Sequence, residues 1–220
     1  MIVLQSPSGL STRPAGAVYC VGRNYADHAR ELANPVPTSP LIFMKSPACI
    51  VPFEGALSLP VALGRCDHEL EIAVRIGSDL VDVDEAAALG AISHMGLALA
   101  LTRRDVQSVL KKKGHPWDLA RSFPGACPLT PLRPVEAIGD HSLRLTINGE
   151  VRQQGRCSQM IFSIGTLVAF LSRHMPLRAG DLLLTGTPAG VGPLHDGDVL
   201  VGFLDDCLLY TSDAADDLYR

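Results

Sequence analysis

Polar and apolar side chains alternate along residues 68–76, a pattern that is typical of a half-buried β-strand. Side chains two residues apart on a strand point to the same face, so Glu69 and Glu71 are predicted to lie side by side. The other face of this strand is expected to contact the core through its apolar side chains, which are Leu70, Ile72, Val74 and Ile76.

Similar patterns predict the remaining elements. Apolar runs indicate four further strands, at residues 17–21, 41–45, 95–101 and 182–184. Helix-forming residues and helical periodicity indicate three helices, at residues 25–32, 84–91 and 158–174, with Asp84 as the N-cap of the second. Asn148-Gly149 between two alternating segments predicts a β-hairpin with a type I′ turn. Because helices and strands do not alternate regularly, the predicted class is α+β with an antiparallel or mixed sheet.

Composition limits the partners and the compartment. The chain has 220 residues, 47% of them hydrophobic, which suits one large domain of an ordinary globular protein. With a net charge of −4 and no long apolar run, neither nucleic acid nor a membrane is expected as a partner. The six cysteines lack CxxC spacing, which indicates reduced, mostly buried thiols. No secretory signal is visible, so a cytoplasmic location is expected. The basic run 111–113 is interpreted as a solvated helix end.

Two neighbouring carboxylates repel each other unless a positive charge lies between them or one of them takes up a proton. Glu69 and Glu71 therefore admit three interpretations. They can lie on a solvated strand face, share a proton as an acid pair, or bind a hard divalent cation through their oxygens. Polar groups elsewhere in the chain bear on this choice.

On a helix, His28 and Glu31 share a face, where they can form a water-activating dyad or an exposed charge pair. The segment 102–107 follows a buried strand, and its arginines suit a bidentate grip on a carboxylate, although a helix N-terminus with surface charges also explains it. Lys45 ends a predicted strand and can meet an anion or solvent. The glycine-rich loop 185–192 lacks the order of a nucleotide loop, so contact with a small ligand is expected there.

Together these segments resemble the fumarylacetoacetate hydrolase family, and in particular its small acylpyruvate hydrolase branch. The resemblance extends from Tyr19 to Phe203, and its motifs are weak singly and specific together. They are Val21-Gly22-Arg23-Asn24-Tyr25-Ala26-Asp27-His28, Phe43-Met44-Lys45, His68-Glu69-Leu70-Glu71, Leu101-Thr102-Arg103-Arg104-Asp105-Val106-Gln107, Gly114 to Ser122, Asn148-Gly149-Glu150, Met160-Ile161-Phe162 and Thr185-Gly186-Thr187-Pro188.

The turn-rich residues 1–16 are expected to form a short N-terminal arm. The resemblance implies a mixed β-sandwich roll that forms a homodimer, with one catalytic domain at 17–206. It implies Mg²⁺ or Mn²⁺ held by carboxylates, Glu69 and Glu71 among them. The implied reaction is the cleavage of a carbon–carbon bond in an acylpyruvate by water, which gives pyruvate and a carboxylic acid.

Roles for individual residues follow from the same resemblance. His28 and Glu31 are implied to activate the water. The small keto-acid substrate is implied to contact five residues, which are Arg23, Lys45, Arg104, Gln107 and Thr187. Decarboxylation of oxaloacetate and isomerisation of a dienedioate use the same kind of site and remain alternatives.

Two positions and one segment depart from the family pattern. The third carboxylate ligand is replaced by Ala100, which removes one negative charge from the implied metal site. The catalytic lysine of the pocket is replaced by Arg121, which keeps a positive charge but does not release a proton near neutral pH. A keto-acid binder without catalytic activity is therefore an alternative. Residues 207–220 differ from the closing strands of the family and are expected to form an atypical tail.

Overall fold

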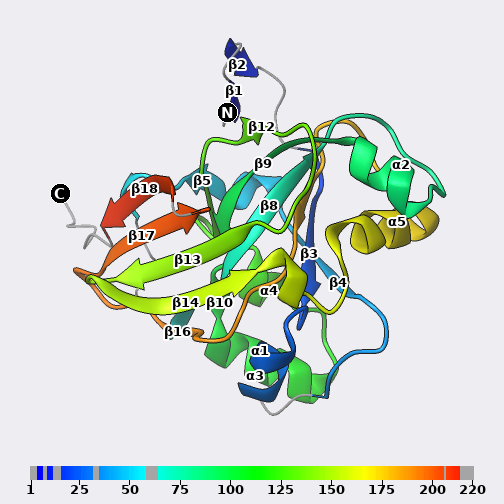
Figure 1. The fold of residues 1–220 in the computed structure, drawn as a ribbon. Helices are drawn as coiled ribbons and strands as arrows, with labels where there is room; N and C mark the ends of the chain where they lie inside the picture. The colour runs from blue at the N-terminus through cyan, green and yellow to red at the C-terminus, as the bar shows by residue number, and fades with distance from the viewer. Residues whose placement is uncertain are drawn as a thin grey trace.

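A computed structural model describes residues 16–31, 35–57 and 64–205, together with the strands at 4–6, 9–11 and 207–213. Two sheets, one of eight strands and one of five, form the body of the fold (Figure 1). They pack together where β13 (Ser142–Ile147) contacts β8 (Leu70–Ile76) and β17 (Val199–Leu204) contacts β9 (Ile92–Leu99). The predicted α+β class with a mixed β-sandwich roll is confirmed.

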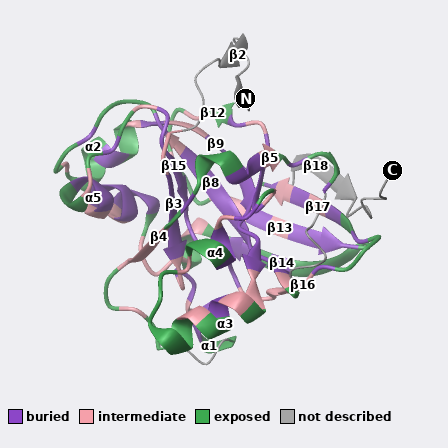
Figure 2. Ribbon diagram, turned by 180° about the vertical axis from the view of Figure 1, so that it is seen from behind, coloured by how far each residue is buried: buried purple, intermediate pink, exposed green. Residues whose placement is uncertain are grey.

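The eight-stranded sheet has the order β4-β3-β15-β8-β9-β11-β5, and β12 also pairs with β9. The bounds not yet given are β4 (Leu41–Lys45), β3 (Val18–Gly22), β15 (Leu182–Leu184), β11 (Cys127–Leu129), β5 (Ile50–Pro52) and β12 (Arg133–Pro134). The pairs β3–β15 and β5–β11 are parallel, and the others are antiparallel. The central strands are buried along most of their length (Figure 2), so this sheet provides much of the core.

The segment predicted as one half-buried strand is divided, and all of its residues except the partly exposed Arg75 are buried. β7 (Cys66–His68) ends before Glu69, and β8 begins after it, so Glu69 joins strands of two different sheets. β8 lies between β15 and β9, and Glu71 is only 1% exposed, as is Ile76 on the same strand. The prediction of a half-buried strand is wrong because its polar face packs against other polar groups of the protein instead of facing solvent.

The five-stranded sheet has the order β14-β13-β17-β18-β6, with β14 at Glu150–Arg156, β18 at Cys207–Asp213 and β6 at Gly55–Ala56. The predicted hairpin is confirmed as β13–β14, and Asn148 and Gly149 have φ of 54° and 83°, as a type I′ turn requires. β18 pairs with β17 and β6, so this part of the expected tail belongs to the sheet. Residues 214–220 lie outside the described residues.

A small third sheet, in the order β10-β7-β16, brings distant segments together. Its outer strands are β10 (Thr102–Arg103) and β16 (Gly192–Pro193), so it connects the chain around Glu69 to the end of the glycine-rich loop. In the expected N-terminal arm, β1 (Leu4–Ser6) pairs with β2 (Gly9–Ser11); residues 1–3, 7–8 and 12–15 lie outside the described part.

Two groups of helices lie at different ends of the sheets (Figure 1). One group is α1 (Ala26–Glu31), α3 (Arg104–Lys113) and α4 (Asp118–Arg121), and the other is α2 (Glu85–Gly90) and α5 (Ile164–His174), which pack on each other. Asp84 caps α2 as predicted, since its carboxylate accepts the Ala87 N–H at 2.8 Å. α5 begins after Ser163 and not at residue 158, because residues 157–159 form a 3₁₀ helix (η3, Cys157–Gln159) and the Ser163 hydroxyl caps α5. A second 3₁₀ helix is η1 (Pro47–Cys49).

The predictions for the basic run and for the cysteines are consistent with this fold. The lysines at 111–113 form the exposed last turn of α3. The cysteines whose side chains are described are all free, and burial raises the thiol pKa of Cys66 to about 11 and of Cys127 to about 12. Within the described residues, every helix is too short or too polar to cross a lipid bilayer.

Candidate active site

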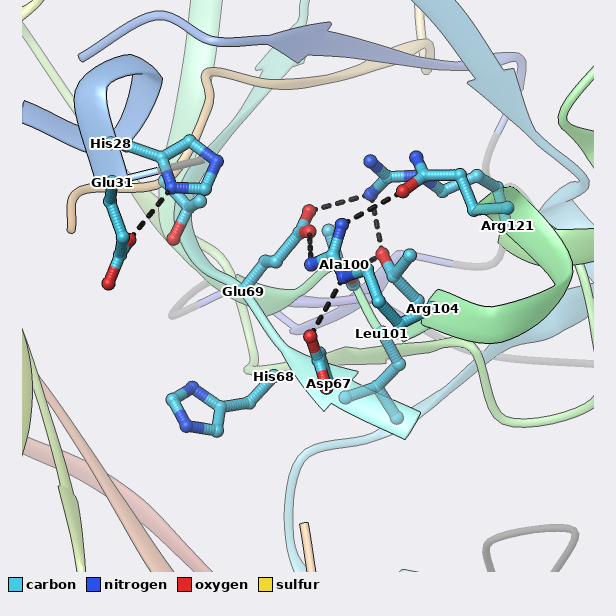
Figure 3. Close-up of polar contacts among 12 residues, drawn as sticks. His28, Glu31, Asp67, His68, Glu69, Ala100, Leu101, Arg104 and Arg121 are labelled. Carbon is cyan, nitrogen blue, oxygen red and sulfur yellow. Dashed lines mark hydrogen bonds and ion pairs between the residues drawn. The ribbon is translucent and has the colours of Figure 1, made fainter. Parts of the chain in front are cut away.

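Glu69 lies between two guanidinium groups (Figure 3). Its Oε1 accepts from Arg104 Nη2 at 2.7 Å, and its Oε2 accepts from Arg121 Nη1 at 2.6 Å. The Glu69 side chain is 5% exposed, and burial alone would raise the pKa of its carboxyl. The charges of Arg121 and Arg104 outweigh burial and hold this pKa at about 2. Glu69 is therefore a fully ionised carboxylate with both oxygens engaged.

Arg104 is held in place by a second buried acid. Its Nε donates to Asp67 Oδ2 at 2.8 Å, and its Nη1 donates to Gln107 Oε1 at 2.9 Å. Asp67 is 1% exposed and also accepts from Arg65 Nε at 2.6 Å. The sequence analysis missed Asp67, although extending the alternation of Glu71 and Glu69 by two residues would have found it. Three acids at alternate positions thus face one polar cluster.

Glu71 has a different kind of partner, which is the backbone of the glycine-rich loop. Gly186 N–H donates to Glu71 Oε2 at 2.6 Å. Gly186 has a φ of +96°, and a Cβ at this position would lie 2.7 Å from Asn24 Cβ, so the close approach requires glycine. Burial and the neighbouring charge of Glu69 raise the pKa of Glu71 to about 8. Glu71 is therefore largely protonated at neutral pH.

His28 and Glu31 form the predicted pair at the end of α1. His28 Nδ1 lies 3.3 Å from Glu31 Oε2, and Gly190 N–H donates to Glu31 Oε1 at 3.1 Å. The His28 side chain is 6% exposed, whereas that of Glu31 is 34% exposed. The alternative of an exposed charge pair is therefore wrong for His28. Its imidazole faces the pocket, and Glu31 lies behind it and fixes its orientation.

Arg121 lies at the end of α4 and is 6% exposed. Its Nη1 donates to Thr102 Oγ1 at 2.6 Å in addition to Glu69, and its guanidinium carbon lies 4.5 Å from the centre of the Phe43 ring. Lys45 holds the backbone of Arg121 in place, because its Nζ donates to the carbonyl oxygens of Leu101 and Arg121. Lys45 is 1% exposed and does not line the pocket, so the structure places it among the supports of Arg121.

One pocket brings together most of the residues predicted to act. The predicted residues that line it are Arg23, His28, Glu69, Glu71, Arg104, Gln107, Arg121 and Thr187. Val21, Phe43, Lys111 and Trp117 also line the pocket, so cationic and apolar side chains face the same space. Glu31 and Lys45 lie behind this lining. The arrangement can bind a small anion and place an imidazole beside it.

The sequence analysis also missed two buried amides that connect the elements of the site. Gln153 Oε1 accepts from Leu70 N–H at 2.9 Å, and its Nε2 donates to Thr187 Oγ1 at 2.7 Å. Asn24 Nδ2 donates to the carbonyls of Thr185 and Phe162, which ties α1 to the glycine-rich loop. The alternating pattern of the hairpin marked no special role for Gln153, because its partners lie more than 30 residues away in the sequence.

The donor set of this pocket does not suit a divalent cation. Among the described residues, no three His, Cys, Asp or Glu side chains gather closely enough to hold a metal ion. Ala100 is fully buried and its side chain offers no oxygen. Because Arg104 and Arg121 already engage both oxygens of Glu69, a cation there would face two positive charges. Glu71 alone keeps an oxygen that accepts from no described donor.

Comparison with known proteins places the chain in a family. Residues 17–206 match the family described as Fumarylacetoacetate (FAA) hydrolase C-terminal. The chain is 45% identical over 184 residues to the oxaloacetate tautomerase FAHD1, mitochondrial, of Bos taurus. The aligned region covers 82% of this chain and 83% of that protein. It is 43% identical over 202 residues to the oxaloacetate tautomerase YcgM of Escherichia coli strain K12, which covers 90% and 92%.

A solved structure extends the likeness to a ligand complex. The fumarylpyruvate hydrolase of Pseudomonas aeruginosa in complex with Mn²⁺ and pyruvate superposes with a TM-score of 0.88 at 33% identity, over 97% of this chain and 96% of that chain. A divalent cation is therefore bound by a relative with the same fold. The resemblance carried by the sequence motifs is confirmed, and this chain belongs to the fumarylacetoacetate hydrolase family of enzymes.

Proposed function

We propose that this chain catalyses keto–enol tautomerisation of a small 2-oxo diacid of the oxaloacetate class. The observation that carries the proposal is that the His28 imidazole and three guanidinium groups line one pocket. A base next to fixed positive charges is what removal of a proton beside a keto group requires. The names of the bovine and Escherichia coli relatives support this substrate class.

Each residue has a defined task in the proposed reaction. Arg23, Arg104, Gln107 and Thr187 bind the carboxylate and keto oxygens of the substrate. His28, oriented by Glu31, takes a proton from the carbon beside the keto group, and the electron pair of that C–H bond forms the enolate. The guanidinium groups stabilise the negative charge on the enolate oxygen. His28 then returns the proton to that oxygen, which yields the enol and restores the imidazole.

Hydrolysis of an acylpyruvate to pyruvate and a carboxylic acid is the second candidate. The His28–Glu31 pair favours it, because the same imidazole could deprotonate a water molecule. The predicted Mg²⁺ or Mn²⁺ belongs to this candidate, and the Mn²⁺ complex of the Pseudomonas aeruginosa relative supports it. The donor set of this pocket favours the first candidate. The homodimer and the cytoplasmic location stay predictions.

The experiment follows the enol absorbance of oxaloacetate with purified protein, and in parallel that of an acylpyruvate. For the first candidate, the protein accelerates interconversion of the oxaloacetate keto and enol forms above the protein-free rate. His28→Asn lowers this rate about 100-fold, whereas His174→Asn, on the exposed end of α5, leaves it unchanged.

The products decide among the remaining alternatives. Loss of acylpyruvate enol with release of pyruvate would replace the first candidate by the second. Release of carbon dioxide from oxaloacetate would indicate decarboxylation. Binding of oxaloacetate without turnover of any of these substrates would leave a keto-acid binder without catalytic activity.

A further inference from the structure

Cationic groups outnumber carboxyl groups in this pocket without a metal ion. The carboxyl groups of its lining are Glu69 and Glu71, whereas its guanidinium and ammonium groups are Arg23, Arg104, Arg121 and Lys111. Asp67 lies behind them and is paired with Arg65 as well as Arg104. A dication added to this set would have no third carboxylate to compensate it, because position 100 is an alanine. The charge balance therefore favours a site that operates with guanidinium groups alone.

The contacts of Arg121 place its charge where a cation would otherwise bind Glu69. Its Nη1 lies 2.6 Å from Glu69 Oε2 and 2.6 Å from Thr102 Oγ1. To coordinate Glu69, a metal ion would have to separate that carboxylate from a buried guanidinium. Leaving a buried charge without its partner is strongly unfavourable. Arg121 and Ala100 thus both disfavour a metal ion at Glu69. Arg121 places a positive charge there, and Ala100 lacks the negative charge of a carboxylate.

Arg121 also keeps a donor for a ligand. Its Nε is buried and has no hydrogen-bond partner among the described residues. A buried N–H group of this kind is costly to leave unsatisfied. Because Arg121 also lines the pocket, the part of its guanidinium that faces the pocket can donate to a ligand oxygen. The planar guanidinium matches the geometry of a carboxylate, which a single cation does not distinguish from other oxygen ligands.

We propose that this chain binds its 2-oxo acid without a divalent cation, and that the Arg121 guanidinium supplies the positive charge in the cation's place. The inference rests on the proposed function for the class of ligand only. It assigns no new chemical step, because the guanidinium forms hydrogen bonds to ligand oxygens and exchanges no proton with them.

Calorimetry with oxalate, which mimics the pyruvate enolate, tests the proposal. Oxalate is first titrated into the protein in EDTA, and Mn²⁺ is titrated separately without oxalate, because oxalate itself chelates the cation. We expect oxalate to bind in EDTA and Mn²⁺ alone to produce no binding heat. After free Mn²⁺ has been removed by desalting, oxalate is expected to bind the Mn²⁺-treated protein with a dissociation constant within about twofold of the EDTA value.

Variants separate a guanidinium site from a metal site. Arg121→Gln is expected to weaken oxalate binding in EDTA about tenfold or more, because a charge-assisted contact is lost. At a metal site the same change would remove a repulsive charge and strengthen Mn²⁺ binding. Lys112→Gln is the matched control, since it removes one positive charge from an exposed position outside the pocket lining. Ala100→Asp combined with Arg121→Lys is expected to gain Mn²⁺ binding.

The outcomes distinguish this inference from the proposed function. Oxalate binding that requires Mn²⁺ would overturn the inference and leave the proposed function in place. Absence of oxalate binding in both conditions would also overturn it. Oxalate binding in EDTA without acceleration of oxaloacetate tautomerisation would support the inference and remove the proposed function. If the double variant does not fold, the EDTA titration and Arg121→Gln still decide.

Discussion

The two sides of the pocket hold their carboxyl groups in opposite ways. On the arginine side, which we define as Glu69, Arg104 and Arg121, full charges keep the acid ionised and hold its pKa at about 2. On the glycine-loop side, Glu71 accepts only a backbone N–H from Gly186, and burial raises its pKa to about 8. Two acids separated by one residue thus differ in protonation state, because a peptide dipole stabilises an anion less than a guanidinium charge does.

Removing the acid of the arginine side should have the largest effect. Glu69→Gln would leave two buried guanidinium groups without their shared carboxylate, and breaking such a pair costs about 3–5 kcal/mol. Glu71→Gln, the matched change on the glycine-loop side, should cause no such loss, because Glu71 is already neutral in the folded state and the variant does not ionise in the unfolded state. Urea unfolding at neutral pH in EDTA measures both. Equal losses would contradict the proposed difference between the two sides.

Disturbing the loop tests the glycine-loop side itself. Gly186→Ala should lower the free energy of unfolding by about 2–3 kcal/mol, since the residue has a positive φ and its Cβ would clash with Asn24. Gly197→Ala is the control, because Gly197 has a φ of +82° with no atom near the added Cβ, and only the backbone cost of about 1 kcal/mol applies. Thermal and urea unfolding compare the two. A similar cost for both would mean that the loop does not fix Gly186 against Asn24.

The pH dependence of stability sharpens the comparison through a small change at each step in pH. The pKa of Glu71 rises on folding from 4.5 to about 8, so between these values the folded state binds more protons than the unfolded state. Its contribution to stability is therefore lost as pH rises through this window, by at most about 1.4 kcal/mol per pH unit. Glu69 has the opposite sign, and its contribution is lost as pH falls from 4.5 to about 2.

Urea unfolding from about pH 5 to pH 8 in EDTA, with wild type and Glu71→Gln, isolates the contribution of Glu71. The variant is expected to lose the downward slope that the wild type shows. A slope that is the same in both proteins would assign it to another group.

Local patterns in the sequence predicted the elements better than the site. The strand 41–45, the Asn148-Gly149 hairpin and the Asp84 cap depend on neighbouring residues and were correct. The division of a strand at Glu69 was not predicted, because it depends on pairing with segments that are distant in the sequence. The motifs located the pocket residues, but the pairing of Glu69 with Arg121 spans 52 positions and carries no local signal.

The buried ammonium of Lys45 has a mechanical consequence. α4 has only four residues, too few to be stable as an isolated helix. Lys45 ends the edge strand β4 of the large sheet, and its ammonium donates to the carbonyl of Arg121, the last residue of α4. Movement of α4 away from the sheet would deprive this buried charge of a hydrogen-bond partner. The position of Arg121 is therefore as rigid as the sheet strand that holds the end of α4.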